Sequence, residues 1–243
     1  MLVSDGGHRH SGSYAWIIAT TDHLKIASGQ GPVDGALSLM SSFRAESTGI
    51  LHGLIALGHV LFSLASTHSA IRNDPSLFLN DRLAATIQIH CDSKSLIHRL
   101  REWTTYPTFY PSLGNKCDSD LSLEIVGLIT HEYKRSSVTF HHVRGHQDEK
   151  KPWDQLTWAE KLNVNCDKRA TATLLSLPHI DRPSFGTLVY SNVDLLANNV
   201  PITNKVAQTV RDAYGSPEMR PYLCKKFNWA SSTCDLVDWL CLG

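Results

Sequence analysis

The sequence predicts an α/β fold in which helices flank a five-stranded mixed sheet, in the order βββαβαβα, with a small helical C-terminal appendage. Three observations support this prediction. Three strand-like segments follow one another near the N-terminus, two later ones alternate with stretches of helical periodicity, and signals for short helices dominate after about residue 186. We therefore assign residues 1–175 to one domain and residues 186–243 to the appendage.

The first three predicted strands form an antiparallel meander. They cover residues 2–4, 14–18 and 24–27. A turn-prone segment at residues 21–23 separates the second strand from the third, and residues 29–35 are again rich in turn residues. We expect the first strand to end at Asp5, because two glycines follow it.

A long helix is predicted next. Ser41 or Ser42 can cap it, and it would run from about Phe43 into an apolar stretch at residues 49–66. That stretch is about long enough to span a bilayer, but three polar residues interrupt it, namely His52, His59 and Ser63. A helix buried against the sheet explains this composition better, so we expect no membrane partner.

The later strands and helices alternate. Residues 86–92 have a period of two, and the apolar face of this fourth strand would carry Ile87, Ile89 and Cys91. Two helices follow, the second capped by Ser119. Residues 138–143 form the fifth strand. The last helix would begin at a capping box made by Thr157 and Glu160.

Four acidic residues lie where such a fold brings its chain segments together. Asp5 and Asp92 each end a strand, Glu46 lies in the first turns of the long helix, and Asp167 lies on the last helix. Carboxylates so gathered repel one another, so the cluster is stable mainly when divalent cations fill it. Oxygen ligands favour Mg²⁺ or Mn²⁺, and two such ions about 4 Å apart support phosphodiester hydrolysis.

Five segments resemble, in order, the signatures of type 1 ribonuclease H domains, especially those of retroelement polyproteins. They are Ser4-Asp5-Gly6-Gly7, Arg44-Ala45-Glu46, His90-Cys91-Asp92-Ser93, Val143-Arg144-Gly145-His146 and Asn163-x-x-x-Asp167-x-x-Ala170. The resemblance covers about residues 1–172. It implies a ribonuclease H-like fold and hydrolysis of the RNA strand of an RNA/DNA hybrid. It also implies a reverse transcriptase domain of the same polyprotein as a partner.

The resemblance assigns roles to individual residues. It implies that Asp5, Glu46, Asp92 and Asp167 are catalytic and hold two Mg²⁺ ions, with Mn²⁺ as the alternative. His146 would assist proton transfer or product release. Substrate binding would involve three further residues, namely Gly6, Ser93 and Asn163. Two intervals are longer than in the family, which we assign to insertions around residues 68–83 and 148–158.

Composition narrows the function further. Lys+Arg and Asp+Glu balance at 23 each, so nucleic acid would be held locally and not by a global basic field. Candidate contacts are Arg9, Lys94, Arg99 and Arg101 for phosphates and Trp103 and Tyr106 for stacking, although a solvated helix face or core packing is the ordinary role of such residues. The six cysteines form no C-x-x-C pair, and the N-terminal residues leave no room for a secretion signal. We expect an intracellular protein, in the cytoplasm or nucleus.

Two other functions are compatible with parts of the pattern. The neutral net charge and the insertions would also suit a catalytically silent connector domain of a polyprotein. A transposase or integrase of the same fold would have a Glu as its last carboxylate, a few tens of residues after the second Asp, which Glu46 and Asp167 do not match.

A metal pair at His141 and His142 is disfavoured because neighbouring strand residues face opposite sides. The aromatic residues of the appendage, Phe227, Trp229 and Trp239, are interpreted as hydrophobic anchors.

Overall fold

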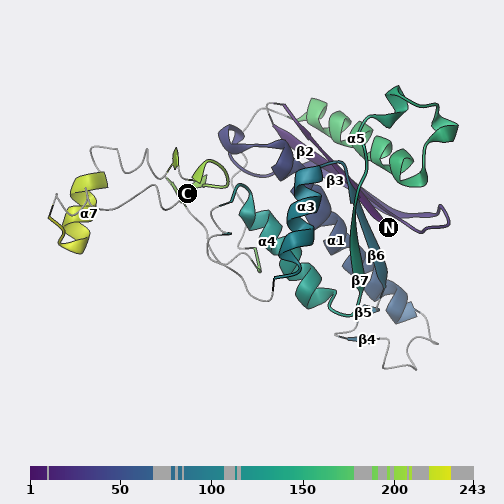
Figure 1. Ribbon diagram of the computed structural model, residues 1–243, viewed down its shortest axis with the longest axis horizontal. Helices are drawn as coiled ribbons and strands as arrows, with labels where there is room; N and C mark the ends of the chain where they lie inside the picture. The colour runs from purple at the N-terminus through teal and green to yellow at the C-terminus, as the bar shows by residue number, and fades with distance from the viewer. Residues whose placement is uncertain are drawn as a thin grey trace.

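A five-stranded mixed sheet forms the centre of the protein (Figure 1). The computed structural model describes residues 1–9, 11–67, 78–79, 82–83, 85–106, 113, 116–177, 188–190, 196–197, 200–206, 208–209 and 219–230. The strands are β1 (Leu2–His8), β2 (Gly12–Ala19), β3 (Lys25–Pro32), β6 (Thr86–Cys91) and β7 (Ser137–His142). Their order is β3-β2-β1-β6-β7, with antiparallel pairing among the first three strands and parallel pairing of β1 with β6 and of β6 with β7.

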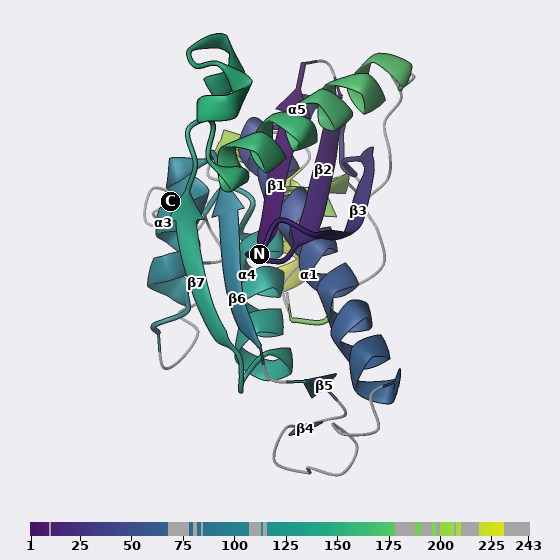
Figure 2. The ribbon, with the colours of Figure 1, turned by 90° about the vertical axis from the view of Figure 1, so that its right-hand side faces the viewer.

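Helices cover the two faces of the sheet unequally (Figure 2). One face carries α1 (Ser42–Thr67), α3 (Lys94–Trp103) and α4 (Ser119–Gly127), and the other carries α5 (Trp158–Ser176). The strand order, the strand directions and the helical cover confirm the predicted α/β fold. They are the arrangement expected of the ribonuclease H-like fold that the sequence resemblance implies.

The apolar alternation of the strands divides the core in two. Leu2, Ile87 and Ile89 face α1, α3 and α4 in the larger cluster, whereas Val3 and Ile17 face α5 in the smaller one. Cys91 belongs to the larger cluster, as the period-two pattern predicts. Both faces of β1 are therefore buried, which is why this strand lies at the centre of the sheet.

The long apolar helix α1 packs on the sheet, as predicted. Ser41 caps it, because the backbone N–H of Arg44 donates to the Ser41 hydroxyl at 2.9 Å. Its segment Ser42–Leu64 is long and apolar enough to cross a membrane by length and composition, yet half of the apolar window is buried inside the protein. Leu54 and Leu57 belong to the core cluster between α1 and the sheet.

Three local predictions were wrong. Strand β1 does not end at Asp5, because its pairing with β2 continues to His8. Strand β3 extends to Pro32 through residues expected to form a turn, since the Trp16 ring covers Gly29, where a Cβ would lie only 2.5 Å from the ring. The residue before α4 is Asp118, in the left-handed region with φ 51°, so Ser119 is the first residue of the helix and not its cap.

The insertion predicted at residues 68–83 lies mostly outside the described residues. The part that is described forms the short strands β4 (Phe78–Leu79) and β5 (Arg82–Leu83), which pair with each other. The insertion predicted at residues 148–158 is described in full. It contains the 3₁₀ turns η5 (Gln147–Glu149) and η6 (Trp153–Gln155).

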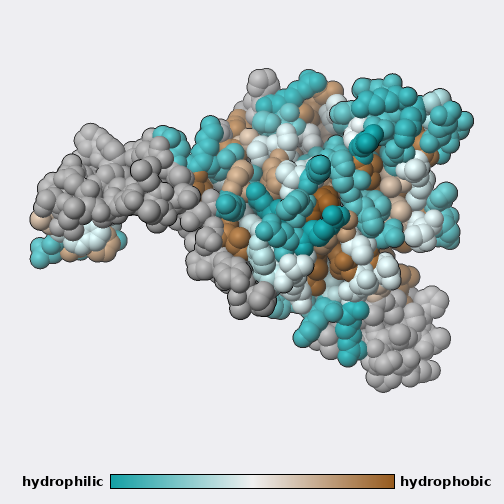
Figure 3. All heavy atoms as spheres, viewed as in Figure 1, coloured by the Kyte–Doolittle hydropathy of each residue, from teal (hydrophilic) through white to brown (hydrophobic). Residues whose placement is uncertain are grey.

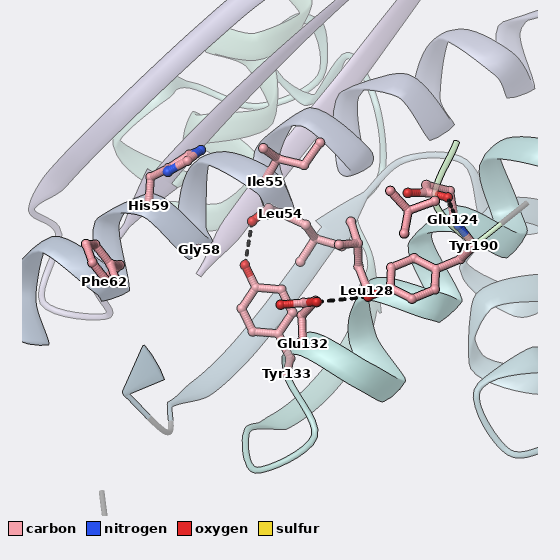
Figure 4. A pocket seen from close by; sticks show the side chains of 11 residues that line it. Leu54, Ile55, Gly58, His59, Phe62, Glu124, Leu128, Glu132, Tyr133 and Tyr190 are labelled. Atoms are coloured by element: carbon pink, nitrogen blue, oxygen red, sulfur yellow. Dashed lines mark hydrogen bonds between the residues drawn. The ribbon is translucent and has the colours of Figure 1, made fainter. Parts of the chain in front are cut away.

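The chain after α5 returns to the domain. The Tyr190 backbone N–H donates to Glu124 Oε2 at 2.7 Å and its hydroxyl donates to Glu132 Oε1 at 2.9 Å, beside a groove of about 410 Å³ between α1 and α4 (Figure 4). The Asp118 N–H donates to the Thr203 carbonyl at 2.6 Å. Two described segments of the region assigned to the appendage therefore contact α4 or the residue that precedes it.

The other described elements of this region are short. Strands β8 (Leu196–Ala197) and β9 (Val200–Pro201) form a small hairpin. Helix α7 (Met219–Phe227) lies apart from the sheet, at the left of Figure 1. Two of the helix signals after residue 186, the serine–proline pair at residues 216–217 and Ser232, lie outside the described residues.

Candidate active site

The register of two parallel strands places Asp5 beside Asp92. Strands β1 and β6 pair at Leu2 with Ile89 and at Val3 with His90, and each aspartate lies two residues beyond the last pair. Because side chains on a strand alternate, Asp5 and Asp92 point to the same face, the one that α5 covers. Asp5 is thus in the middle of β1 but at the point where β1 and β6 separate.

Glu46 reaches these aspartates from the opposite face because α1 approaches β1 closely. A Cβ on Gly6 would lie 2.4 Å from the Glu46 backbone nitrogen and 2.5 Å from the Ala45 carbonyl carbon, so only glycine permits this contact. Gly6, which we expected to bind substrate, lies here against the backbone of α1. The Cys91 thiol donates to Glu46 Oε2 at 3.3 Å, and the ligand atoms of Glu46, Cys91 and Asp92 lie within 4.8 Å of one another.

A buried ion network fixes the start of α1, two residues before Glu46. The Arg44 guanidinium lies 2.9 Å from Asp120 Oδ2 and 3.3 Å from Asp118 Oδ1. Its Nε donates to the Asp34 carbonyl at 3.0 Å, and the Ser41 hydroxyl donates to Asp118 Oδ2 at 2.8 Å. The N-terminal ends of α1 and α4 are therefore joined through one arginine.

Helix α5 supplies Asn163 and Asp167 from the other side. The predicted capping box is present: the Thr157 hydroxyl accepts from the Glu160 N–H, and the Glu160 carboxylate accepts from the Thr157 N–H. Asn163 is buried and donates from Nδ2 to Asp5 Oδ2 at 3.0 Å. The structure therefore places Asn163 below the surface as a support for Asp5, while Asp167, one turn later, remains partly exposed.

His146 lies at the exposed edge of the cluster. Its Nδ1 is 3.8 Å from Asp167 Oδ2 and 3.8 Å from Glu149 Oε1, and its side chain is 61% exposed. The residue adopts φ 51°, in the left-handed region. The long loop that follows it does not carry the histidine away from the carboxylates.

Mutual repulsion and burial shift the titration of three carboxylates. Burial, and then the charges of Asp92 and Asp167, raise the pKa of Asp5 to about 8. Burial, and then the charges of Asp5 and Asp92, raise the pKa of Glu46 well above its ordinary value. Burial also raises the pKa of Asp167, although the nearby His146 opposes this shift. The four carboxylates therefore form one electrostatic cluster.

Two residues at the site were not assigned roles from the sequence. Cys91 binds Glu46 through its thiol, and Gly145 approaches Asp92 so closely that a Cβ would lie 2.6 Å from Asp92 Oδ2. Both lie inside segments that carry the family resemblance, so their place in these segments was the available signal. His142 completes this edge, with its Nε2 3.1 Å from the Asp92 carbonyl oxygen.

The remaining candidate contacts are spread over the protein. Ser93 precedes α3, and its backbone N–H donates to Cys91 Sγ at 3.3 Å. Trp103 is buried, as core packing predicts. Arg99 lies over the Phe43 ring at 4.1 Å, and Arg101 donates to the Phe140 carbonyl, so both make contacts within the domain. Of the other described candidates, Arg9 and Lys94 are exposed and Tyr106 is partly exposed.

Comparison with known proteins gives weak similarities. No family model matches the chain, and no curated protein matches it. A structure of LC11-RNase H1 in complex with an RNA/DNA hybrid is 12% identical, with a TM-score of 0.44 over 70% of this chain and 93% of that chain. RNase H1 from the halophilic archaeon Halobacterium salinarum is 13% identical, with a TM-score of 0.41 over 72% of this chain and 97% of that chain.

A second structure of LC11-RNase H1, isolated from compost, is 11% identical, with a TM-score of 0.41 over 71% of this chain and 96% of that chain. TM-scores below 0.5 are too low to decide the fold or the activity. The strand order and the helical cover of this chain establish its architecture without them.

Proposed function

We propose that this chain is a metal-dependent endonuclease of the ribonuclease H type, which hydrolyses the RNA strand of RNA/DNA hybrids. The observation that carries the proposal is the convergence of four carboxylates from β1, α1, the end of β6 and α5. Asp5 and Glu46 are each only 6% exposed, and no cationic side chain is paired with either in the ion pairs of the described residues. Buried carboxylates without a counter-ion reduce stability, which favours a role that requires cations.

The donor set fits hard divalent cations. Asp5, Glu46, Asp92 and Asp167 offer only oxygen atoms, which suits two Mg²⁺ ions or Mn²⁺ in their place. Burial raises the pKa of the Cys91 thiol, which is consistent with a protonated thiol that donates to Glu46 and is not a ligand. Bound at these carboxylates, two such ions would activate a water molecule and neutralise charge on the phosphate oxygens.

The protein's own residues then orient and complete the site. Asn163 fixes one oxygen of Asp5, and Cys91 fixes one oxygen of Glu46. His146, exposed beside Asp167, is placed to accept or release a proton through its imidazole nitrogens at the solvent edge. Recognition of the hybrid would depend on shape and on the 2′-hydroxyl groups, not on base sequence.

The cellular setting also belongs to this proposal. The resemblance to retroelement domains supports a polyprotein that includes a reverse transcriptase, and the cysteine pattern supports an intracellular site of action. Both expectations rest on the sequence alone.

Cleavage of an end-labelled RNA/DNA hybrid tests the activity. We expect Mg²⁺-dependent cuts in the RNA strand, no cleavage of duplex DNA, and loss of cleavage in Asp92→Asn and in EDTA. If wild type and Asp92→Asn are equally inert and calorimetry detects no Mg²⁺ binding to the folded chain, the domain is a silent connector and the nuclease proposal fails.

A further inference from the structure

The loop between β7 and α5 is anchored to the rest of the domain. Its residues Gln147 and Leu156 are buried, while the residues between them are exposed. Two ion pairs hold this exposed part on α5: Asp148 Oδ2 lies 3.2 Å from Lys168 Nζ, and Glu160 Oε1 lies 3.0 Å from Lys151 Nζ. The insertion therefore has a defined position along the helix.

An exposed tryptophan lies on this loop between two lysines of α5. Trp153 is 49% exposed, and its ring lies 5.9 Å from Lys161 Nζ and 6.0 Å from Lys168 Nζ. Residues seven apart in a helix share one face, about 10 Å apart along the axis. We call these three residues the α5 platform.

The platform begins where the acidic cluster ends. Lys168 follows Asp167 directly in the sequence, and His146 immediately precedes the loop that carries Trp153. Figure 2 shows the loop at the top of the molecule, beyond the ends of β6 and β7 and next to α5. A polyanion that enters the acidic cluster therefore meets the platform within one or two helical turns.

We infer that the α5 platform is a subsite for the nucleic-acid backbone, with the Trp153 indole stacking on a sugar or base and the Lys161 and Lys168 ammonium groups contacting phosphates. The inference rests on the proposed function and adds a binding subsite for the substrate strand next to the scissile phosphodiester. Four carboxylates repel phosphates, so cations close to them are needed to hold a strand there. The adjacent loop carboxylates Asp148 and Glu149 lie near Lys168 and His146.

Nucleic acid fits this surface better than a protein partner does. The exposed residues around Trp153, from Asp148 to Gln155, are charged or polar apart from Pro152, so no apolar patch surrounds the indole. Figure 3 shows hydrophilic residues over the part of the surface formed by this loop and α5. A single aromatic ring flanked by cations is the usual pattern for binding a strand by stacking and by charge.

Fluorescence anisotropy of a labelled RNA/DNA hybrid, in the full chain carrying Asp92→Asn to prevent cleavage, tests the inference. We expect Trp153→Ala to raise Kd about 5-fold to 100-fold, and Trp153→Phe to retain most of the affinity. The double variant Lys161→Ala with Lys168→Ala should weaken binding and reduce the slope of log Kd against log salt by about two. In the otherwise wild-type chain, the same changes should raise KM and leave kcat unchanged.

Lys134→Ala is the matched control, because this exposed lysine precedes β7 at the end of the strand remote from the site. It should leave Kd and the salt slope unchanged. Thermal unfolding confirms that each variant is folded. A chain that binds hybrid without cutting it contradicts the nuclease proposal but not the platform. The platform is overturned if no nucleic acid binds, or if the Trp153 and lysine variants bind hybrid with wild-type Kd and salt slope.

Discussion

The two halves of the acidic cluster differ in how the fold holds them. The buried half consists of Asp5 on β1 and Glu46 on α1. Gly6 allows backbone contact between these two elements, and Asn163 and Cys91 each bind one carboxylate oxygen. The open half consists of Asp92, Asp167 and His146. Asp167 is 36% exposed, and His146 is on a loop.

This difference separates two tasks. The buried half has a fixed geometry and carries the electrostatic cost, since burial and repulsion raise the pKa values of Asp5 and Glu46. The open half can adjust to a substrate because solvent screens its charges and its side chains have room to move. Burial of Asp5 and Glu46 therefore lowers the stability of the protein but gives the site a fixed geometry. Mutations can measure both effects.

Asp5→Asn should have the largest effect on activity. It keeps the hydrogen bond from Asn163 to the side-chain oxygen but removes a charge from the buried half, so we expect hybrid cleavage to fall by about 10³-fold or more. The same change should raise the Tm of the metal-free protein by several degrees, because it removes a buried and repelled carboxylate. Single-turnover cleavage and calorimetric unfolding measure the two effects.

Asp167→Asn is the matched variant in the open half. It should also reduce cleavage, but it should change the Tm of the metal-free protein by less, since Asp167 is partly solvated. Equal Tm changes in Asp5→Asn and Asp167→Asn would show that the two halves do not differ as we describe.

Arg44→Met should have the largest effect on stability. The substitution leaves the buried Asp118 without its cation and frees the start of α1, so we expect a loss of about 3–5 kcal/mol in the free energy of unfolding. Urea unfolding measures this loss. Arg169→Met is the control, because Arg169 is exposed and, within the described part of the chain, its side chain donates to the exposed Ser28 hydroxyl. A loss below about 1 kcal/mol for Arg44→Met would mean that the network does not hold α1 in place.

The faces of the sheet and the start of α5 were predictable from the sequence because they depend on short-range patterns. The alternation of residues 86–92 placed Cys91 on the apolar face, and the capping box at Thr157 marked the start of α5. The nearness of Glu46 and Asp92 also followed, since strand ends and helix starts meet at one edge of an α/β sheet, whereas Asp5 lies inside β1.

The contacts that hold the site were not predictable because they join distant segments. The pairing of Arg44 with Asp118 depends on how α1 packs against α4, and the place of Asp5 within β1 depends on the register with β2 and β6. Hydrophobic periodicity predicts neither this ion pair nor this strand register. The extension of β3 similarly required Trp16 to cover Gly29 from the neighbouring strand.

The pH dependence of stability should reveal the buried half in the metal-free protein. The folded-state pKa of Asp5, about 8, lies above its ordinary value of 3.8, so the folded state binds more protons between these values. Stability in EDTA should therefore be greatest at or below about pH 4, as far as Asp5 contributes, and fall as the pH rises to about 8. Asp5→Asn should flatten this slope, and saturating Mg²⁺ should oppose it. Urea unfolding across this range provides the measurement, and identical slopes in wild type and Asp5→Asn would contradict the shift.

His146→Ala tests the open half with a smaller effect. The imidazole is exposed and lies near Asp167 without a buried partner among the described residues, so its loss should leave the free energy of unfolding within about 0.5 kcal/mol of wild type. We expect kcat for hybrid cleavage to fall about 10-fold to 100-fold, with KM nearly unchanged. Steady-state kinetics check both values, and an unchanged kcat would remove His146 from the proposed site.

Gly145→Ala should produce the smallest effect. It tests whether Gly145 supports the packing of its loop or the position of Asp92. The added methyl group would lie 2.6 Å from Asp92 Oδ2, which is the end of a side chain and can rotate away. At Gly6 the same methyl group would meet the backbone of α1, which cannot move without displacing the helix. Gly145→Ala should therefore leave the Tm almost unchanged but weaken Mg²⁺ binding up to about tenfold, by turning Asp92 away from Glu46. Calorimetric titration with Mg²⁺ measures this change, and a lowered Tm with normal Mg²⁺ affinity would show that the loop supports the fold and not the position of Asp92.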